Sequence, residues 1–234
     1  MSAQPFVLGI TRYAEPAWVW QETIAAAISS DLQPVRRFVV DDGEHMLGSV
    51  GGFELIRPTR NLGCAGSWNL LCRTVFDELR VATMIILNGD CAVATGTFSR
   101  MMDSEYAVVA AQGFSAFRLD ERVWRRVGEF DEEYYPAYWE DTDYRRRLQL
   151  AGEPIDEWRV EEVSRPSYGR ATYASGITHG WLIENAGYQG STGEKCAWFQ
   201  ERWVANRDRY VAKWGGMPGA ETYDRPFNGE AQRQ

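Results

Sequence analysis

Apolar segments of strand length alternate with a segment of helical periodicity in the N-terminal part of the chain. The runs that predict buried strands cover residues 6–10, 37–40, 53–56 and 83–87. After the first run, Trp20, Ile24 and Ala27 recur at helical spacing, so we expect a helix over residues 16–30. Strands that alternate with helices in this way predict a mostly parallel sheet with helices on both faces.

Glycines and further apolar runs extend this pattern past the middle of the chain. Residues 61–69 contain two glycines that suit a tight turn into a second helix, which we expect from about Ser67 to Leu79. Two more strands are predicted over residues 106–111 and 114–119. The first half of the chain, to about residue 119, therefore reads as one α/β unit.

The C-terminal part of the sequence has a different character. A helix is predicted from Asp141 to Ala151, with Gly152 ending it. Residues 165–193 are rich in Gly, Ser and Tyr, which is typical of loops over a site. Beyond them, Trp203 and Tyr210 lie on an amphipathic pattern, and this helix is expected to pack back onto the domain.

Polar clusters follow three of the predicted strands. They are Thr11-Arg12-Tyr13, Asp41-Asp42-Gly43 and Asn88-Gly89-Asp90. Parallel strands bring their carboxyl ends to one edge of the sheet, where ligands of such folds bind. Asp90 at this edge could hold a divalent cation that neutralises a diphosphate. The same triplet is also compatible with an Asn-Gly turn that carries a solvated aspartate.

Aromatic and acidic residues crowd the start of the helix predicted from Asp141. Tyr134, Tyr135, Tyr138 and Trp139 precede the paired carboxylates Glu140 and Asp141. An aromatic platform beside a carboxylate suits a sugar next to a general base. Acidic residues in a first helical turn also oppose the helix dipole favourably, so a core cluster with an acidic helix start remains the alternative.

Composition and charge restrict the class of protein. Hydrophobic residues make up 44% of the chain and charged residues 25%, which is typical of a globular protein. The net charge of −8 disfavours nucleic acid and anionic lipid as partners. The four cysteines form no CxxC pair, no apolar run is long enough to span a bilayer, and residues 1–5 show no signal-peptide pattern. We therefore expect a cytoplasmic protein.

Five motifs in one order resemble the family 2 glycosyltransferases of GT-A fold. The motifs are Ile10-Thr11-Arg12-Tyr13, Val39-Val40-Asp41-Asp42-Gly43, Asn61-Leu62-Gly63 with Ala65 and Asn69, Ile86-Leu87-Asn88-Gly89-Asp90, and Gly128-Glu129-Phe130-Asp131-Glu132 followed by Glu140-Asp141-Thr142-Asp143. The resemblance covers roughly residues 6–152, and it is to small stand-alone members, bacterial or phage-encoded. It implies a single Rossmann-like, mostly parallel sheet covered by helices, with a loop-rich and helical C-terminal extension. The domain would span residues 1–195 and the helical tail residues 196–234.

The resemblance also implies roles for individual residues. Expected donor contacts are Thr11, Arg12, Tyr13, Asp42, Asn61, Gly66, Asn69, Asn88 and Gly89. Among them, the Asp42 carboxylate would accept a hydrogen bond from the nucleotide base. The triplet Asn88-Gly89-Asp90 stands where the family has its Asp-x-Asp motif, and Asn88 departs from that pattern. Asp90 is therefore the expected ligand of Mn²⁺ or Mg²⁺.

Further roles follow for the C-terminal half. Asp141 matches the catalytic base of the family, and Tyr138, Trp139 and Glu140 would contact the acceptor. His179 is a candidate second metal ligand, since several GT-A enzymes complete the metal shell with a downstream histidine, although a lone histidine is equally often structural.

The expected activity is metal-dependent, inverting transfer of a sugar from a nucleotide diphosphate, with a UDP-sugar as the first candidate donor. A glycan is the expected acceptor, and a modified base in phage DNA or a virion protein is the alternative. Two other functions stay open: a sugar nucleotidyltransferase, although the segment Gly9–Arg12 lacks the Gly-rich basic loop of that class, and a non-catalytic glycan-binding module, which Asn88 slightly favours.

Overall fold

The computed structural model describes residues 4–13, 15, 17–43, 48–111, 113–158, 162–164, 171–173, 177–179 and 193–230. Side chains are described within these ranges except at residues 17–19 and 159–200. In the part of the chain so described, no helix is both long and apolar enough to cross a membrane.

A seven-stranded sheet forms the centre of the molecule. In spatial order its strands are β3 (Glu54–Ile56), β2 (Arg36–Asp41), β1 (Val7–Arg12), β4 (Thr83–Asn88), β7 (Ala116–Asp120), β6 (Val108–Ala111) and β8 (Asp156–Trp158). The strands β3, β2, β1 and β4 are parallel, β7 is antiparallel to both β4 and β6, and β8 is parallel to β6. The predicted mostly parallel α/β sheet is confirmed.

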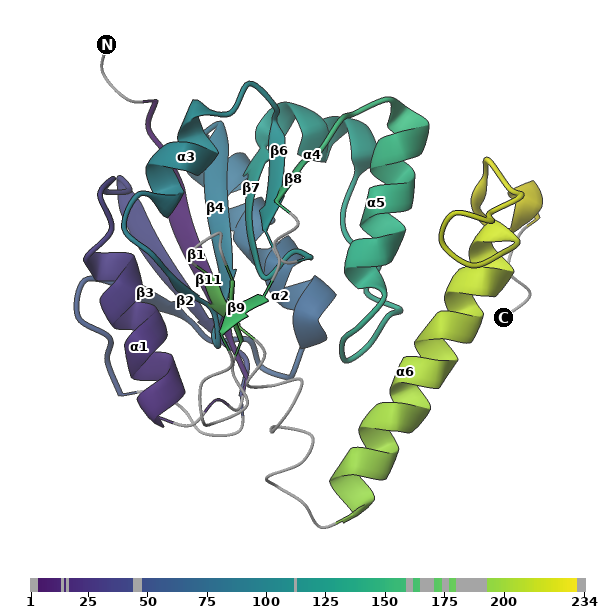
Figure 1. The fold of residues 1–234 in the computed structure, drawn as a ribbon, viewed down its shortest axis with the longest axis horizontal. Coiled ribbons are helices and arrows are strands. Elements are labelled where there is room, and N and C mark those ends of the chain that lie inside the picture. The colour runs from purple at the N-terminus through teal and green to yellow at the C-terminus, as the bar shows by residue number, and fades with distance from the viewer. Residues whose placement is uncertain are drawn as a thin grey trace.

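Helices cover both faces of this sheet because its central strands are apolar on both sides (Figure 1). Along β4, Met84 and Ile86 belong to one buried cluster, whereas Ile85 belongs to the other. The first cluster includes side chains of α2 (Gly63–Cys72), the π-helical stretch η1 (Arg73–Glu78), α4 (Glu121–Val127) and α5 (Glu140–Ala151). The second includes side chains of α1 (Ala17–Ile28) and α3 (Thr97–Asp103).

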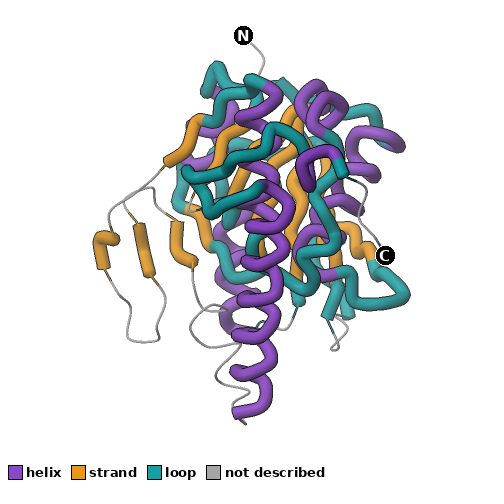
Figure 2. Tube along the Cα trace, turned by 90° about the vertical axis from the view of Figure 1, so that its right-hand side faces the viewer, coloured by secondary structure: helices purple, strands orange, loops and turns teal. Residues whose placement is uncertain are grey.

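A second sheet and a C-terminal helical segment lie outside this three-layer core. A four-stranded antiparallel sheet contains, in spatial order, β5 (Ala92–Val93), β11 (Ile177–His179), β10 (Ala171–Tyr173) and β9 (Glu162–Ser164). The long helix α6 (Gly193–Trp214) precedes the short 3-10 helix η3 (Pro226–Gly229). Figure 2 shows α6 running lengthwise across the outside of the domain.

The second predicted helix begins four residues earlier than expected, at Gly63 instead of Ser67. Its N-cap residue, Leu62, makes no side-chain cap. Instead, the Asn61 side chain accepts the N–H of Gly63 at 2.8 Å, and the carbonyl of Pro136 accepts the N–H of Cys64 at 2.7 Å. A distant segment therefore satisfies the free donors of the first turn, which local sequence does not reveal.

Candidate functional site

The polar ends of three parallel strands meet at one cavity. In the strand register, Thr11 is paired with Val40 on one side and with Asn88 on the other. A cavity of about 470 Å³ opens beyond these ends, which is the size of a small-molecule site. The expected site residues among those lining it are Thr11, Arg12, Tyr13, Asp42, Asn61, Asn88, Gly89, Asp90, Tyr138, Trp139, Glu140 and Asp141.

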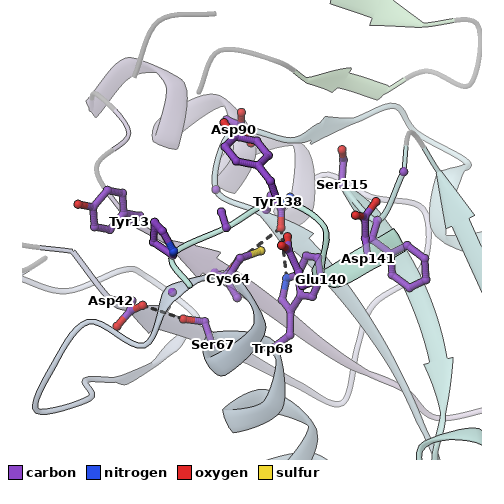
Figure 3. A pocket seen from close by; sticks show the side chains of 18 of the residues that line it. Tyr13, Asp42, Cys64, Ser67, Trp68, Asp90, Ser115, Tyr138, Glu140 and Asp141 are labelled. Carbon is purple, nitrogen blue, oxygen red and sulfur yellow. Dashed lines mark hydrogen bonds between the residues drawn. The ribbon is translucent and has the colours of Figure 1, made fainter. Parts of the chain in front are cut away.

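Asp42 lies at one end of this cavity and Asp141 at the other (Figure 3). The Asp42 carboxylate accepts the N–H of Leu62 at 2.8 Å and the hydroxyl of Ser67 at 3.0 Å. Burial raises the pKa of Asp42, and these two hydrogen bonds oppose that shift. Asp42 thus fixes the start of α2 to the end of β2, and its carboxylate forms part of the cavity wall.

The residues after β1 are held by internal contacts. The Arg12 guanidinium is paired with the buried carboxylate of Asp41 at 2.8 Å, so its charge is neutralised inside the protein. The main-chain N–H of Tyr13 donates to Glu15 at 2.9 Å. Arg12 therefore lines the cavity while its charge is already paired with a carboxylate. This arrangement is compatible with a structural role and with contact to a ligand.

Asp90 is buried at the turn after β4, close to a second carboxylate that the sequence interpretation did not include. The carbonyl of Gly89 accepts the hydroxyl of Thr23 from α1 at 2.8 Å, which fixes the turn. A Cβ atom on Gly89 would lie 2.5 Å from a carboxylate oxygen of Glu15 and 2.9 Å from the main-chain oxygen of Thr11, so a side chain there would displace its neighbours. Burial, followed by the Asp90 charge, raises the pKa of Glu15 to about 7.

The amide oxygen of Asn88 is held by other side chains of the protein. That oxygen accepts the indole N–H of Trp68 at 3.3 Å, and the Thr11 hydroxyl lies 3.5 Å away. At the first position of the Asp-x-Asp pattern, this protein therefore has a neutral amide in place of a carboxylate. The amide oxygen accepts a hydrogen bond from the indole of Trp68. The carboxylates placed at this turn are Asp90, which belongs to it, and Glu15, which lies beside Gly89.

The donor set at this turn fits a hard divalent cation. Asp90 and Glu15 supply carboxylate oxygens, which Mg²⁺ and Mn²⁺ prefer, and such ions commonly use one or two carboxylates together with substrate phosphates. No group of three or more His, Cys, Asp or Glu side chains among the described residues is arranged to hold a metal. The pairing of β11 with β5 brings the main chain of His179 beside the end of β5, and its side chain lies outside the described residues.

Two of the expected donor contacts lie away from the cavity. Asn69 is fully buried, and its amide binds both main-chain groups of Phe130 at 2.8 and 2.9 Å. Gly66 packs within α2, where a Cβ atom would meet Leu62 at 2.9 Å. Both residues position α2, and neither lines the cavity; their contact with the donor stays a prediction.

The opposite wall of the cavity has an unusual main-chain conformation. Tyr138 and Trp139 have φ values of 75° and 78°, which places two consecutive aromatic residues in the left-handed region. Each such residue costs about 1–3 kcal/mol and persists only where surrounding contacts hold it. The turn is held from one side by Gly63, whose φ of 70° and missing side chain let Pro136 approach the start of α2.

Glu140 and Asp141 begin α5 in different surroundings. Glu140 is 5% exposed, and burial, followed by the Asp141 charge, raises its pKa to about 8. The Cys64 thiol hydrogen-bonds to it, and one carboxylate oxygen has no partner among the described residues. Asp141 instead accepts the Thr142 N–H at 2.7 Å and is paired with Arg145 at 2.9 Å.

Not every aromatic residue of this region belongs to the site. Tyr134 is fully buried, with its hydroxyl 3.3 Å from Asp143, and it does not line the cavity. Of the four aromatic residues of the expected platform, Tyr138 and Trp139 line the cavity, whereas Tyr134 and Tyr135 do not. The sequence interpretation also missed Trp203, a cavity-lining residue of α6. Glu15 follows the end of a strand, as Asp90 does, and this position could have identified it as a second carboxylate of the site. Trp203 lies too far along the chain for its sequence position to indicate that it lines the cavity.

The fold is similar to that of solved glycosyltransferases. One neighbour is the mannosyltransferase PcManGT from Pyrobaculum calidifontis, in complex with GDP-Man and Mn²⁺, with a TM-score of 0.52, 15% identity and 72% of this chain covered. A second is GalNAc-T7 with UDP, GalNAc and Mn²⁺, with a TM-score of 0.55, 11% identity and 89% of this chain covered. A third is S. aureus TarS, with a TM-score of 0.53, 12% identity and 67% covered.

These likenesses establish the fold class as GT-A type. The match spans 59%, 50% and 35% of the three neighbouring chains, all of which are longer than the part matched. The sequence matches no protein-family model and no curated protein.

Proposed function

We propose that this protein is a metal-dependent glycosyltransferase that moves a sugar from a nucleotide diphosphate to an acceptor hydroxyl. The observation that carries the proposal is one cavity, in a GT-A-type fold, with Asp42 at one end, the Glu15 and Asp90 carboxylates at the sheet edge, and Glu140 and Asp141 at the other end. This order matches what the reaction requires, namely a nucleoside site, a diphosphate site and a place for the reacting hydroxyl.

The donor end would hold the nucleoside and its diphosphate. Thr11, Tyr13 and Asp42 line the part of the cavity beside the ends of β1 and β2, and Asp42 can accept a hydrogen bond from a base. Asp90 and Glu15 would hold a Mn²⁺ or Mg²⁺ ion, with His179 as a further candidate. When bound, such an ion stabilises the charge of the departing diphosphate.

The reacting hydroxyl would lie beside Asp141. In an inverting transfer, the acceptor oxygen attacks the anomeric carbon, the bond from that carbon to the diphosphate breaks, and Asp141 takes the hydroxyl proton. The ion pair with Arg145, which also contacts Glu157 at 3.1 Å, holds the Asp141 carboxylate in one orientation. Tyr138, Trp139 and Glu140 would contact the acceptor.

A UDP-sugar is the first candidate donor and a GDP-sugar the second, because the neighbours contain UDP or GDP-Man. We place the protein in family 2 on its ordered motifs, with a glycan as acceptor. A DNA or virion-protein acceptor is the alternative, and the net charge of −8 counts against DNA.

A screen of nucleotide sugars tests the activity. The purified protein is incubated with UDP- and GDP-sugars and Mn²⁺ or Mg²⁺, and released nucleoside diphosphate is measured with and without simple glycosides as acceptors. Asp141→Asn should bind donor normally and lose ~10²–10⁴-fold in transfer rate. Glu157→Gln is the matched control, since it disturbs the other partner of Arg145 and should keep the activity. Near-normal transfer by Asp141→Asn would refute its assignment as the base.

A further inference from the structure

The wall of the cavity that carries Trp139 and Glu140 is held in place by the C-terminal helix. The Asn206 amide of α6 is buried and donates to the carbonyls of Ala137 and Tyr138 at 2.9 and 3.1 Å. The Trp139 ring also packs against Tyr210 of α6, with ring centres 5.4 Å apart. The left-handed turn at Tyr138 and Trp139 is therefore fixed by contacts from a helix more than sixty residues away in the chain.

The same helix adds a side chain to the cavity. Trp203 lines the cavity and packs edge-on against Trp139, with ring centres 5.4 Å apart and planes at 61°. It remains 41% exposed, although a large aromatic ring gains free energy from burial. Its neighbour Val204 is exposed to the same extent, at 40%, but does not line the cavity.

Two buried polar groups of this wall lack partners among the described residues. They are the indole N–H of Trp139, which is 9% exposed, and one carboxylate oxygen of Glu140, which is 5% exposed. A buried donor or acceptor without a partner costs about 1–3 kcal/mol, so both are suited to a ligand that supplies the missing hydrogen bonds. Both residues line the cavity.

The chemistry of this wall selects among ligands. A saccharide has an apolar C–H face that stacks on an exposed indole, and its hydroxyls can both donate to Glu140 and accept from the Trp139 N–H. A phosphate backbone fits poorly, because Asp141 is an acidic residue at this end of the cavity and Glu140 offers a carboxyl group in place of a cation.

We propose that α6 completes an acceptor subsite for a neutral saccharide, in which Trp203 is the stacking platform and Trp139 and Glu140 supply the hydrogen bonds. Asn206 is a positioning residue, since its amide binds the main chain of the turn. The proposal rests on the glycosyltransferase function above and names its acceptor class as neutral saccharide. It also makes a helix outside the α/β core a determinant of acceptor binding.

Ligand-observed NMR tests the subsite directly. Methyl glycosides of glucose, galactose and mannose are added at millimolar concentration to the full chain with Mg²⁺ and UDP or GDP, whose own binding is measured by calorimetry. The variants are Trp203→Ala, Trp203→Phe and the matched control Val204→Ala. We expect Trp203→Ala to weaken glycoside binding ~10-fold or more, while Trp203→Phe and Val204→Ala stay near the parent and nucleotide affinity stays unchanged in all.

Three results would overturn the proposal. Trp203→Ala could bind the glycosides as tightly as the parent, or it could lose nucleotide together with glycoside, which would make α6 a support for the whole cavity. A parent that binds UDP or GDP but none of the glycosides would refute the saccharide subsite and leave the proposed function standing. A parent that binds neither nucleotide would contradict the proposed function itself.

Discussion

Glu140 and Asp141 are adjacent in sequence but have different partners. Asp141 is paired with Arg145, whereas Glu140 is enclosed between the start of α5 and Cys64 of α2. Burial and the neighbouring Asp141 charge raise the pKa of Glu140 to about 8, so near neutral pH the free protein holds this carboxyl largely protonated. Enzymes that act on sugars often use two carboxyl groups whose surroundings separate their protonation states.

The raised pKa of Glu140 predicts a pH-dependent stability. In the unfolded chain its pKa is near the ordinary 4.5, so between that value and about 8 the folded state holds a proton that the unfolded state has released. The contribution is full below pH 4.5 and is lost as the pH rises through about 8. The parent therefore loses stability from pH 6 to pH 9, whereas Glu140→Gln has no carboxyl group to ionise at this position. The free energy of unfolding of the variant minus that of the parent should increase over this range by more than ~1 kcal/mol.

Urea unfolding of both proteins at the two pH values measures the difference. Glu133→Gln, at an exposed position, is the control and should follow the parent at both. If the free energy of unfolding changes equally from pH 6 to pH 9 in the parent and in Glu140→Gln, Glu140 ionises in the folded state as freely as in water.

Asp42 gives a second prediction at the residue scale. Asp42→Asn keeps the size of the side chain but weakens its acceptor capacity toward Leu62, Ser67 and a bound base. We expect nucleoside diphosphate affinity to fall ~10-fold, which corresponds to the loss of one charge-assisted hydrogen bond. Calorimetry with UDP and GDP checks this, with the exposed Asp103→Asn as control. Parent-like affinity would place the nucleoside elsewhere in the cavity.

At the scale of elements, the strands were predictable and the helix junctions were not. An apolar run such as residues 83–87 identifies a buried strand from its own residues, and the polar residue after each strand then marks the sheet edge. The short helices α3 and α4, seven residues each, offer too few turns for a periodic signal. The start of α2 depends on a contact with Pro136, and the turn at Tyr138 and Trp139 depends on a contact with Asn206. Sequence spacing predicts neither contact. The domain boundary at residue 196 stays a prediction.

The docking of α6 depends on a buried charge network. Asp143 is fully buried, and its carboxylate contacts Arg147 at 2.9 Å, Lys213 at 2.7 Å and the Trp214 indole N–H at 2.8 Å. Lys213 is 6% exposed. If the Asp143 charge is removed, the carboxylate partner left to Lys213 among the described residues is Asp131, at 2.8 Å. Because charges buried without full compensation are costly, this network holds the helix that carries Trp203.

We predict that Asp143→Asn lowers the free energy of unfolding by ~3–5 kcal/mol. The exposed pair of Arg207 and Asp208 provides a matched control on the same helix, and Asp208→Asn should cost less than ~1 kcal/mol. Urea unfolding followed by tryptophan fluorescence measures both. Equal, small effects would mean that α6 is held by its apolar contacts alone.

In the whole molecule, the sheet edge forms one side of the cavity and the C-terminal helix contributes to the other. The parallel strands bring Thr11, Asp42 and Asp90 to one edge, which is the part that the sequence motifs predicted. The opposite wall comes from the segment before α5 and from α6, and there the sequence indicated the residue types but not their arrangement. We propose that a nucleoside diphosphate and a divalent cation bind together at this sheet edge.

Calorimetry of UDP and GDP binding with and without Mn²⁺, on the parent and on Asp90→Asn, tests this joint binding. The substitution keeps the shape of the turn after β4 and removes one carboxylate charge. We predict binding that requires Mn²⁺ in the parent, disappears on addition of EDTA and falls at least ~10-fold in Asp90→Asn, while Asp141→Asn binds like the parent. Nucleotide binding that is equally tight with EDTA present, or in Asp90→Asn, would show that no metal held by Asp90 takes part in binding.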